Sequence, residues 1–178
     1  MNRFDLQKYL QQELQPYQSN FYDTSFDKEN KKYLCSDQTT ENVYDFDRYI
    51  AEKHDGINLP ASPDAIFIGK KDLYFVEFKN QYVKDIESAQ IKRKFKKGTE
   101  ILRNMLKDFT PKDCRYHFCV VFRKDKNYRY FNFNHIEKSS VRFGLDDINK
   151  EQGQFYDQII TEDIAFFSSQ FTQLKCVG

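Results

Sequence analysis

The fold is decided by the stretch Pro60-Ala-Ser-Pro-Asp-Ala-Ile-Phe-Ile-Gly-Lys-Lys-Asp-Leu-Tyr-Phe-Val-Glu-Phe-Lys79 of this 178-residue chain. Residues 65–68 and 73–78 are two runs rich in β-branched and aromatic side chains, and the segment 69–72 separates them. Two such runs joined by a short connection that contains glycine are typical of a β-hairpin. We therefore expect two antiparallel strands here.

The register of this hairpin brings three polar side chains together. A turn of two residues and a loop of four residues at 69–72 give the same pairing, in which Asp64 lies directly opposite Glu77. Directly opposed residues share a face of the sheet, with Cβ atoms about 4.5–5.5 Å apart. Because Glu77 and Lys79 are two residues apart in one strand, they share that face as well. The sequence thus predicts two carboxylates and one ammonium at one end of the hairpin.

These three side chains suit metal-dependent phosphodiester hydrolysis. Two opposed carboxylates repel each other, and burying them without a cation costs several kcal/mol. Lys79 supplies one positive charge, and a divalent cation bound by Asp64, Glu77 and the carbonyl of Phe78 would supply more. Oxygen ligands of this kind suit Mg²⁺, with Mn²⁺ as the alternative. Such a metal polarises a phosphate and lowers the pKa of an attacking water.

At these positions the chain resembles the PD-(D/E)XK nuclease superfamily, which has the restriction-endonuclease-like fold. Pro63-Asp64 matches the first element of the family motif, and Glu77-Phe78-Lys79 matches the second. The resemblance covers residues 41–122. It implies that Asp64 and Glu77 bind metal and that Lys79 assists catalysis.

The resemblance also implies site residues outside the hairpin. Many members of this superfamily add an acidic residue from the preceding helix, for which Glu41, Asp45 and Glu52 are the candidates. Some members carry glutamine on the following helix with an aromatic residue one turn later. Gln90 is the candidate here, although Phe95 does not have the spacing of the Gln-x-x-x-Tyr form.

Basic residues on the following helix are candidates for binding nucleic acid. The chain has a net charge of +1, but residues 61–110 carry 11 basic and 7 acidic side chains. A local basic excess is typical of a protein that binds a phosphate backbone. At helical spacing Arg93 and Lys97 share one face, and Gln90 lies on their side. We therefore expect Gln90, Arg93 and Lys97 to face the substrate, rather than Lys92 and Lys96.

The remaining sequence predicts one α/β (α+β) domain, with a mixed central sheet flanked by helices. The expected elements are helices over 1–17, 41–53 (capped by Thr40), 85–107 and 162–174, and strands over 115–123 and 128–133. We expect a single nuclease-like domain over residues 1–178. Its core spans about 41–133, and residues 1–40 and 134–178 are flanking additions.

Composition restricts the compartment and the class of site. No apolar run is long enough to span a bilayer, and the N-terminus has no secretory signal, so we expect a cytoplasmic protein that does not bind membranes. Export by another route stays open. The four cysteines, Cys35, Cys114, Cys119 and Cys176, form no C-x-x-C pair, so we expect reduced thiols rather than a zinc site.

Three functions remain open at this point. The first is a nuclease that acts on DNA, and the second is an RNA-cleaving endonuclease toxin on the same fold. The third is a non-catalytic binding or inhibitor protein that keeps the fold, although such a protein has no reason to keep two repelling carboxylates. A homodimer or a complex with a partner protein is compatible with the sequence.

Overall fold

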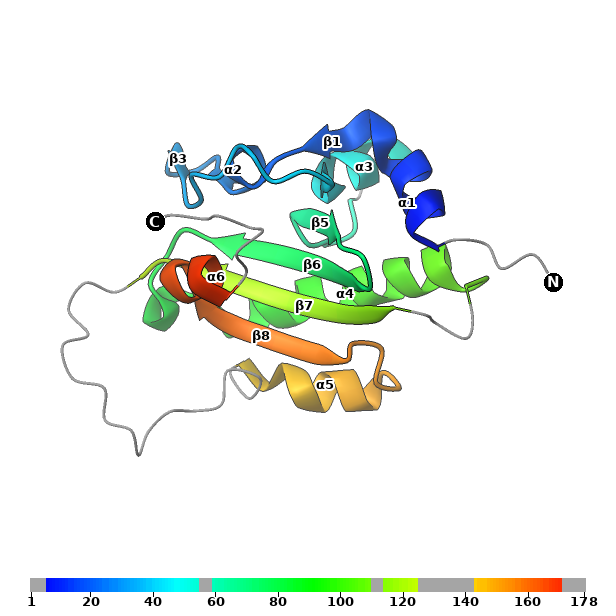
Figure 1. Cartoon of the computed structure of the whole chain (residues 1–178). Helices are drawn as coiled ribbons and strands as arrows, with labels where there is room; N and C mark the ends of the chain where they lie inside the picture. The colour runs from blue at the N-terminus through cyan, green and yellow to red at the C-terminus, as the bar shows by residue number, and fades with distance from the viewer. Residues whose placement is uncertain (1–5, 55–58, 110–113, 125–142, 171–178) are drawn as a thin grey trace.

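A computed structural model describes residues 6–54, 59–109, 114–124 and 143–170. It contains a six-stranded mixed sheet with helices on both faces, which confirms the predicted α+β architecture (Figure 1). The strand order in this sheet is β1-β4-β5-β6-β7-β8. The bounds are β1 (Gln18–Ser19), β4 (Val43–Asp45), β5 (Ala65–Ile68), β6 (Asp72–Lys79), β7 (Arg115–Phe122) and β8 (Gln158–Asp163). Neighbours are antiparallel from β1 to β6 and parallel from β6 to β8.

The helices divide between the two faces of the sheet. The first face is covered by α1 (Leu6–Leu14), α3 (Phe46–Lys53), α4 (Ser88–Leu106) and α5 (Leu145–Glu151), whose apolar residues share one core. The second face is covered by α2 (Phe21–Thr24) and α6 (Ile164–Gln170). Figure 1 shows α4 behind the sheet and α6 in front of it. Since α4 and α5 both connect parallel neighbours in one direction, the usual right-handed crossover puts them on the same face.

Three short elements complete the description. Single 3-10 turns lie at Gln15–Tyr17 and Val83–Asp85. A separate two-stranded sheet is formed by β2 (Phe26–Asp27) and β3 (Lys32–Tyr33). The predicted strand over 115–123 is confirmed, ending at Phe122. The predicted helices over 1–17 and 85–107 are confirmed for α1 and α4, but residues 15–17 form a 3-10 turn and α4 begins at Ser88 rather than at Asp85.

The central hairpin has the predicted register. Ile68 pairs with Leu73 and Ala65 pairs with Val76, so the pairing continues toward Asp64 and Glu77 at the open end. Strand alternation sends Val76 into the core under α6, and it turns Glu77 to the opposite face, which α4 covers. The fold therefore points the polar end of the hairpin at α4.

Helix α4 packs closely on the loop that carries Asp64. Its buried positions Ile91, Phe95, Leu102 and Leu106 follow helical spacing and fill the core. Gly98 is also buried, and a Cβ at this position would lie 2.8 Å from the Cδ of Pro63. Glycine thus allows α4 to approach the residue that precedes Asp64.

The prediction of a helix over 41–53 is wrong in its first part. Residues 43–45 form β4, which pairs with β5, and α3 begins only after Asp45. The Asp45 carboxylate caps α3 by accepting a hydrogen bond of 2.9 Å from the Arg48 backbone N–H. The expected cap, Thr40, donates its hydroxyl to Asp37 instead. Pairing with β5 satisfies backbone groups that a longer helix would have satisfied internally.

The prediction for the C-terminal helix is also wrong at its start. Glu162 and Asp163 end β8, where they pair with β7, and α6 begins at Ile164. The strand β8 beside β7 was not expected, since the sequence analysis assigned residues 158–161 to no element and began the helix at Glu162. The rest of that helix beyond residue 170 and the predicted strand over 128–133 lie outside the described residues.

Two further expectations concern thiols and membranes. Cys114 and Cys119 are buried thiols, but Cys35 is disulfide-bonded, so the prediction that all four cysteines are reduced is wrong. Among the described helices, none has both the length and the apolar character needed to cross a bilayer.

We expect Gly98→Ala to lower the melting temperature, although alanine favours a helix over glycine by roughly 1 kcal/mol. The new methyl group would meet the Pro63 ring at 2.8 Å, and overpacking costs roughly 1–3 kcal/mol. Thermal unfolding measures the effect, and Lys96→Ala on the exposed side of α4 is the control. A melting temperature that rises in Gly98→Ala would contradict this close packing.

Candidate active site

The candidate site lies at the carboxyl end of β6. Glu77 and Lys79 end this strand, Asp64 immediately precedes β5, and the first half of α4 crosses in front of them. From this end of β6 the chain continues to α4. The antiparallel neighbour β5 begins at this same end of the hairpin. Ligands of α/β sheets bind outside the carboxyl ends of strands at such points.

Glu77 is the buried centre of the site. Its side chain is 0% exposed, and two ammonium groups contact it. Lys94 Nζ lies 2.9 Å from Oε2, where it donates a hydrogen bond, and Lys79 Nζ lies 3.0 Å from Oε1. The Lys79 contact is an ion pair without hydrogen-bond geometry, so Oε1 is a buried oxygen without a hydrogen-bond donor.

Asp64 lies beside Glu77, as the register predicted. Its Oδ1 accepts a hydrogen bond of 3.0 Å from Lys94 Nζ, and its Oδ2 accepts one of 2.6 Å from the Phe78 backbone N–H. The N–H and C=O of one strand residue point to the same side. The Phe78 carbonyl is therefore directed toward the Asp64 side rather than toward β7, as a metal ligand at this position requires.

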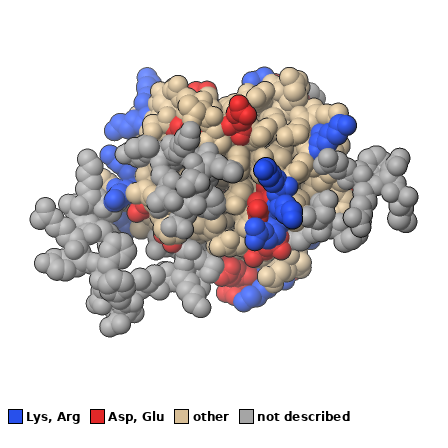
Figure 2. Space-filling model, viewed as in Figure 1, with Lys and Arg blue, Asp and Glu red and all other residues tan. Residues whose placement is uncertain are grey.

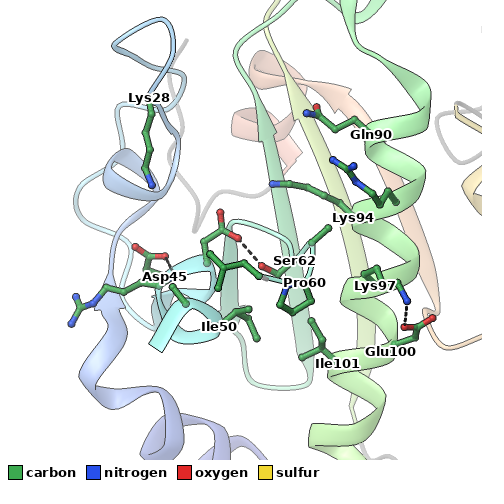
Figure 3. A pocket seen from close by; sticks show the side chains of 16 residues that line it. Lys28, Asp45, Ile50, Pro60, Ser62, Gln90, Lys94, Lys97, Glu100 and Ile101 are labelled. Atoms are coloured by element: carbon green, nitrogen blue, oxygen red, sulfur yellow. Dashed lines mark hydrogen bonds and ion pairs between the residues drawn. The ribbon is translucent and has the colours of Figure 1, made fainter. Parts of the chain in front are cut away.

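Lys94 was not among the predicted site residues. Its ammonium bridges Asp64 and Glu77, and Figure 3 shows its side chain reaching out from α4. Gln90, one turn earlier on the same helix, accepts a hydrogen bond of 2.7 Å from Lys79 Nζ. The spacing of Gln90 and Lys94 is that of the Gln-x-x-x-Tyr form, with lysine in the place of the aromatic residue. That spacing was a signal from which the role of Lys94 could have been read.

The electrostatics of the cluster are set by burial. Burial, followed by the negative charge of Asp64, raises the pKa of Glu77 to about 7. Burial alone would lower the pKa of Lys94, but the carboxylates of Asp64, Glu77 and Asp47 outweigh it and raise that pKa. Lys94 therefore stays charged and holds the two carboxylates together.

The third acidic residue near the site is Asp47, which the sequence did not single out. Burial, with the charge of Asp64 next, raises the pKa of Asp47, and Ser62 donates a hydrogen bond of 2.7 Å to its carboxylate. The sequence had offered three acidic candidates from this region. The first, Asp45, caps α3 and lines the same cavity as Asp47. Glu52 pairs with Arg48 and accepts a hydrogen bond from Tyr17.

The third candidate, Glu41, lines a separate cavity together with Gly69 and Lys70 of the hairpin turn, at the far end of β5 from Asp64. The sequence did not choose among Glu41, Asp45 and Glu52, and of these only Asp45 lines the cavity that Asp47 lines.

Two adjoining cavities meet at the cluster. The first encloses about 1060 Å³ between α3 and α4 (Figure 3). The second encloses about 280 Å³ and extends toward the β2–β3 hairpin. The two cavities share four of their lining residues, which are Lys28, Asp47, Gln90 and Lys94. We call the two cavities together the groove.

Basic side chains line the groove from both walls. Arg93 and Lys97 of α4 lie on its wall with Gln90, as expected, whereas Lys92 and Lys96 are not part of the lining. Lys97 is paired with Glu100 at 2.9 Å, and Arg48 lines the opposite wall. On the face shown in Figure 2, basic and acidic side chains are intermixed.

The residues present fit Mg²⁺ with one condition. Among the residues that the structure describes, no three His, Cys, Asp or Glu side chains are close enough to hold a metal ion together. Mg²⁺ does not need three, since one or two carboxylates with waters and substrate phosphates suffice. Asp64, Glu77, whose buried Oε1 accepts no hydrogen bond, and the Phe78 carbonyl supply such a set. The condition is that Lys94 withdraws from between the carboxylates.

Comparisons of the chain with protein-family models, with curated proteins and with solved structures found no match. The resemblance to the PD-(D/E)XK superfamily therefore stays a prediction, and the function is argued below from the site itself.

We expect Glu77→Gln to stabilise the metal-free protein at pH 8 by roughly 1–3 kcal/mol relative to wild type. The folded pKa of Glu77 is about 7 and its ordinary value is 4.5. Because the native state holds this proton more tightly, wild-type stability is full below pH 4.5 and falls as the pH rises to about 7. Glutamine stays neutral, so the advantage of the variant should grow across that interval.

Urea unfolding in EDTA at several pH values measures this difference. Asp147→Asn, at an exposed position of α5, is the control and should show no such trend. A difference that is independent of pH would mean that Glu77 is already charged in the folded protein throughout this range.

Proposed function

We propose that this protein is a Mg²⁺-dependent nuclease that hydrolyses phosphodiester bonds, most readily in DNA. One observation carries the proposal: Asp64 Oδ1 and Glu77 Oε2 lie 3.0 and 2.9 Å from a single cation, Lys94 Nζ. Two carboxylates that converge on one positive charge suit a divalent cation, and the adjoining groove, which Asp64 lines together with several basic side chains, suits a phosphate.

Each residue of the cluster has a role in this proposal. Asp64, Glu77 and the Phe78 carbonyl would hold Mg²⁺ (or Mn²⁺), which when bound would polarise the phosphate and lower the pKa of the attacking water. Lys79 is held by Gln90 at 2.7 Å and by Glu77 at 3.0 Å, so its ammonium stays beside the carboxylates. From there it orients the water and stabilises negative charge on the phosphate oxygens. Gln90 acts as a positioning residue for Lys79.

Lys94 has two positions in this proposal. Without metal its ammonium offsets the repulsion between Asp64 and Glu77, which lie in a region of low solvent exposure. Bound Mg²⁺ would repel the ammonium, and Lys94 would then turn toward the adjoining groove. Arg93 and Lys97 line that groove, so Lys94 joins them as a contact for substrate phosphates.

A non-catalytic binding protein is the second candidate. The observation that favours it is the same ion pair, since Lys94 already neutralises the carboxylates without metal. The two candidates differ in whether a divalent cation replaces the lysine. An RNA-cleaving toxin uses the same site chemistry, so DNA as the substrate rests on the superfamily resemblance.

The cytoplasmic location stays a proposal as well. The disulfide at Cys35 argues against it, because reducing compartments keep thiols free.

We expect Asp64→Asn and Glu77→Gln each to lower the rate of Mg²⁺-dependent cleavage by on the order of 100-fold or more, because each removes a ligand that stabilises charge in the transition state. Plasmid, single-stranded DNA and total RNA, each with Mg²⁺, Mn²⁺ or EDTA, are the substrates to assay. Asp147→Asn is the control. If either site variant cleaves at the wild-type rate, the hairpin does not hold the active site.

We expect Lys94→Gln to bind Mg²⁺ more tightly than wild type, because the competing ammonium is gone. A ligand that binds only the native state raises its stability by RT ln(1 + [L]/Kd), so the melting temperature should respond at lower Mg²⁺ concentration. The control is Lys96→Gln, on the exposed side of the same helix. Equal Mg²⁺ responses in Lys94→Gln and wild type would show that Lys94 does not compete with metal. No response in either protein would favour the binding protein.

A further inference from the structure

The groove has an unusual distribution of exposed apolar side chains. Among the described residues, four large apolar side chains are exposed: Phe26 (38%), Tyr33 (44%), Leu59 (50%) and Phe166 (39%). Leu59 lines the first cavity, and Phe26 lines the second, together with Asp64 and Lys79. Tyr33 packs against Phe26, with ring centroids 4.7 Å apart. Three of the four thus lie along the groove, where the core does not require them.

The β2–β3 hairpin presents aromatic rings at the mouth of the second cavity. Phe26 pairs directly with Tyr33 across this hairpin, and Tyr22 stacks on Tyr33 at 3.8 Å with an interplanar angle of 10°. We call Tyr22, Tyr33 and Phe26 the aromatic stack. Because each outer ring is supported by the next, the stack holds Phe26 in place at the cavity.

The turn of the same hairpin is also well ordered by hydrogen bonds. The Asp27 carboxylate accepts them from the backbone N–H groups of Glu29 and Asn30, at 3.0 Å each, and from the Asn30 amide at 2.7 Å. Lys28 lies inside this turn and lines both cavities (Figure 3). The hairpin thus places a cation beside an exposed ring, within the cavity that contains Asp64.

We propose that the aromatic stack binds unpaired bases, so that the substrate of the groove is a single-stranded polynucleotide or a single-stranded end. This inference rests on the proposed nuclease function and names its substrate class. Aromatic rings beside cations that contact phosphates are the combination by which proteins bind single strands without sequence preference. The bases of an intact duplex are stacked on one another, which leaves no free base face for Phe26. Phosphates lie along Lys28, Arg93 and Lys97, and a base lies on the ring of Phe26.

A tryptophan reporter tests the contact directly. The chain contains no Trp, so Phe26→Trp introduces the only one, at the cavity. In EDTA, which prevents cleavage, we expect mixed-sequence single-stranded DNA or RNA oligonucleotides to quench its fluorescence, because an indole that stacks on a base is quenched. The same sequence as a duplex should not quench it. Phe166→Trp, on α6, is the matched control and should not respond to either.

The same contact is expected to contribute to affinity. Phe26→Ala and Tyr33→Ala should each weaken single-strand binding by roughly 5- to 100-fold, the range expected for one stacked base. Duplex binding should change as little as in Phe166→Ala. Equal losses for both nucleic acids, or quenching by the duplex, would overturn the inference.

Cleavage by wild type with Mg²⁺ separates failure of the inference from failure of the proposed function. If wild type cleaves, and Phe26→Ala cleaves single strands at the same rate, the substrate inference is wrong while the nuclease stands. If wild type neither binds nor cleaves any of the oligonucleotides, both are wrong.

Discussion

The burial of Glu77 next to Asp64 is the constraint on which the rest of the site depends. Two carboxylates at the end of a buried hairpin need a cation, since the cost of burying them unpaired is several kcal/mol. In the metal-free protein Lys94 meets this need at 2.9–3.0 Å from both carboxylates. Helix α4 must therefore hold Lys94 within hydrogen-bond distance of both carboxylates. The close approach of Gly98 to Pro63 helps to keep the helix in that position.

The same constraint connects the fold to the proposed chemistry. In the proposed function, a divalent cation would take the place that the Lys94 ammonium holds between the two carboxylates. Lys79 does not need to move, because Gln90 holds it beside Glu77. In the proposed function, the groove would receive both the displaced Lys94 and the phosphates. Its two walls come from α3 and α4, and the β2–β3 hairpin closes it with aromatic rings.

Where the predictions failed, long-range pairing was the cause. Residues 43–45 and 158–163 form strands only because a central strand lies ready to pair with them. Their own side chains fit helix starts as well, and propensity within such short windows is a weak guide. The candidates Glu41, Asp45 and Glu52 left out Asp47, because the sequence alone does not show which acidic residue of this region lies near Asp64.

Local sequence patterns alone predict the hairpin, its register, and the meeting of Asp64, Glu77 and Lys79. These follow from alternation and turn length, which are local properties of two adjacent strands. Tertiary structure alone decided that Lys94 bridges the carboxylates, that Asp47 joins them, and that Phe26 lies at the same cavity. Helical periodicity shows which residues share a face, but not how a helix is rotated against a distant strand. That rotation is set by the packing of Ile91, Phe95 and Leu102 in the core.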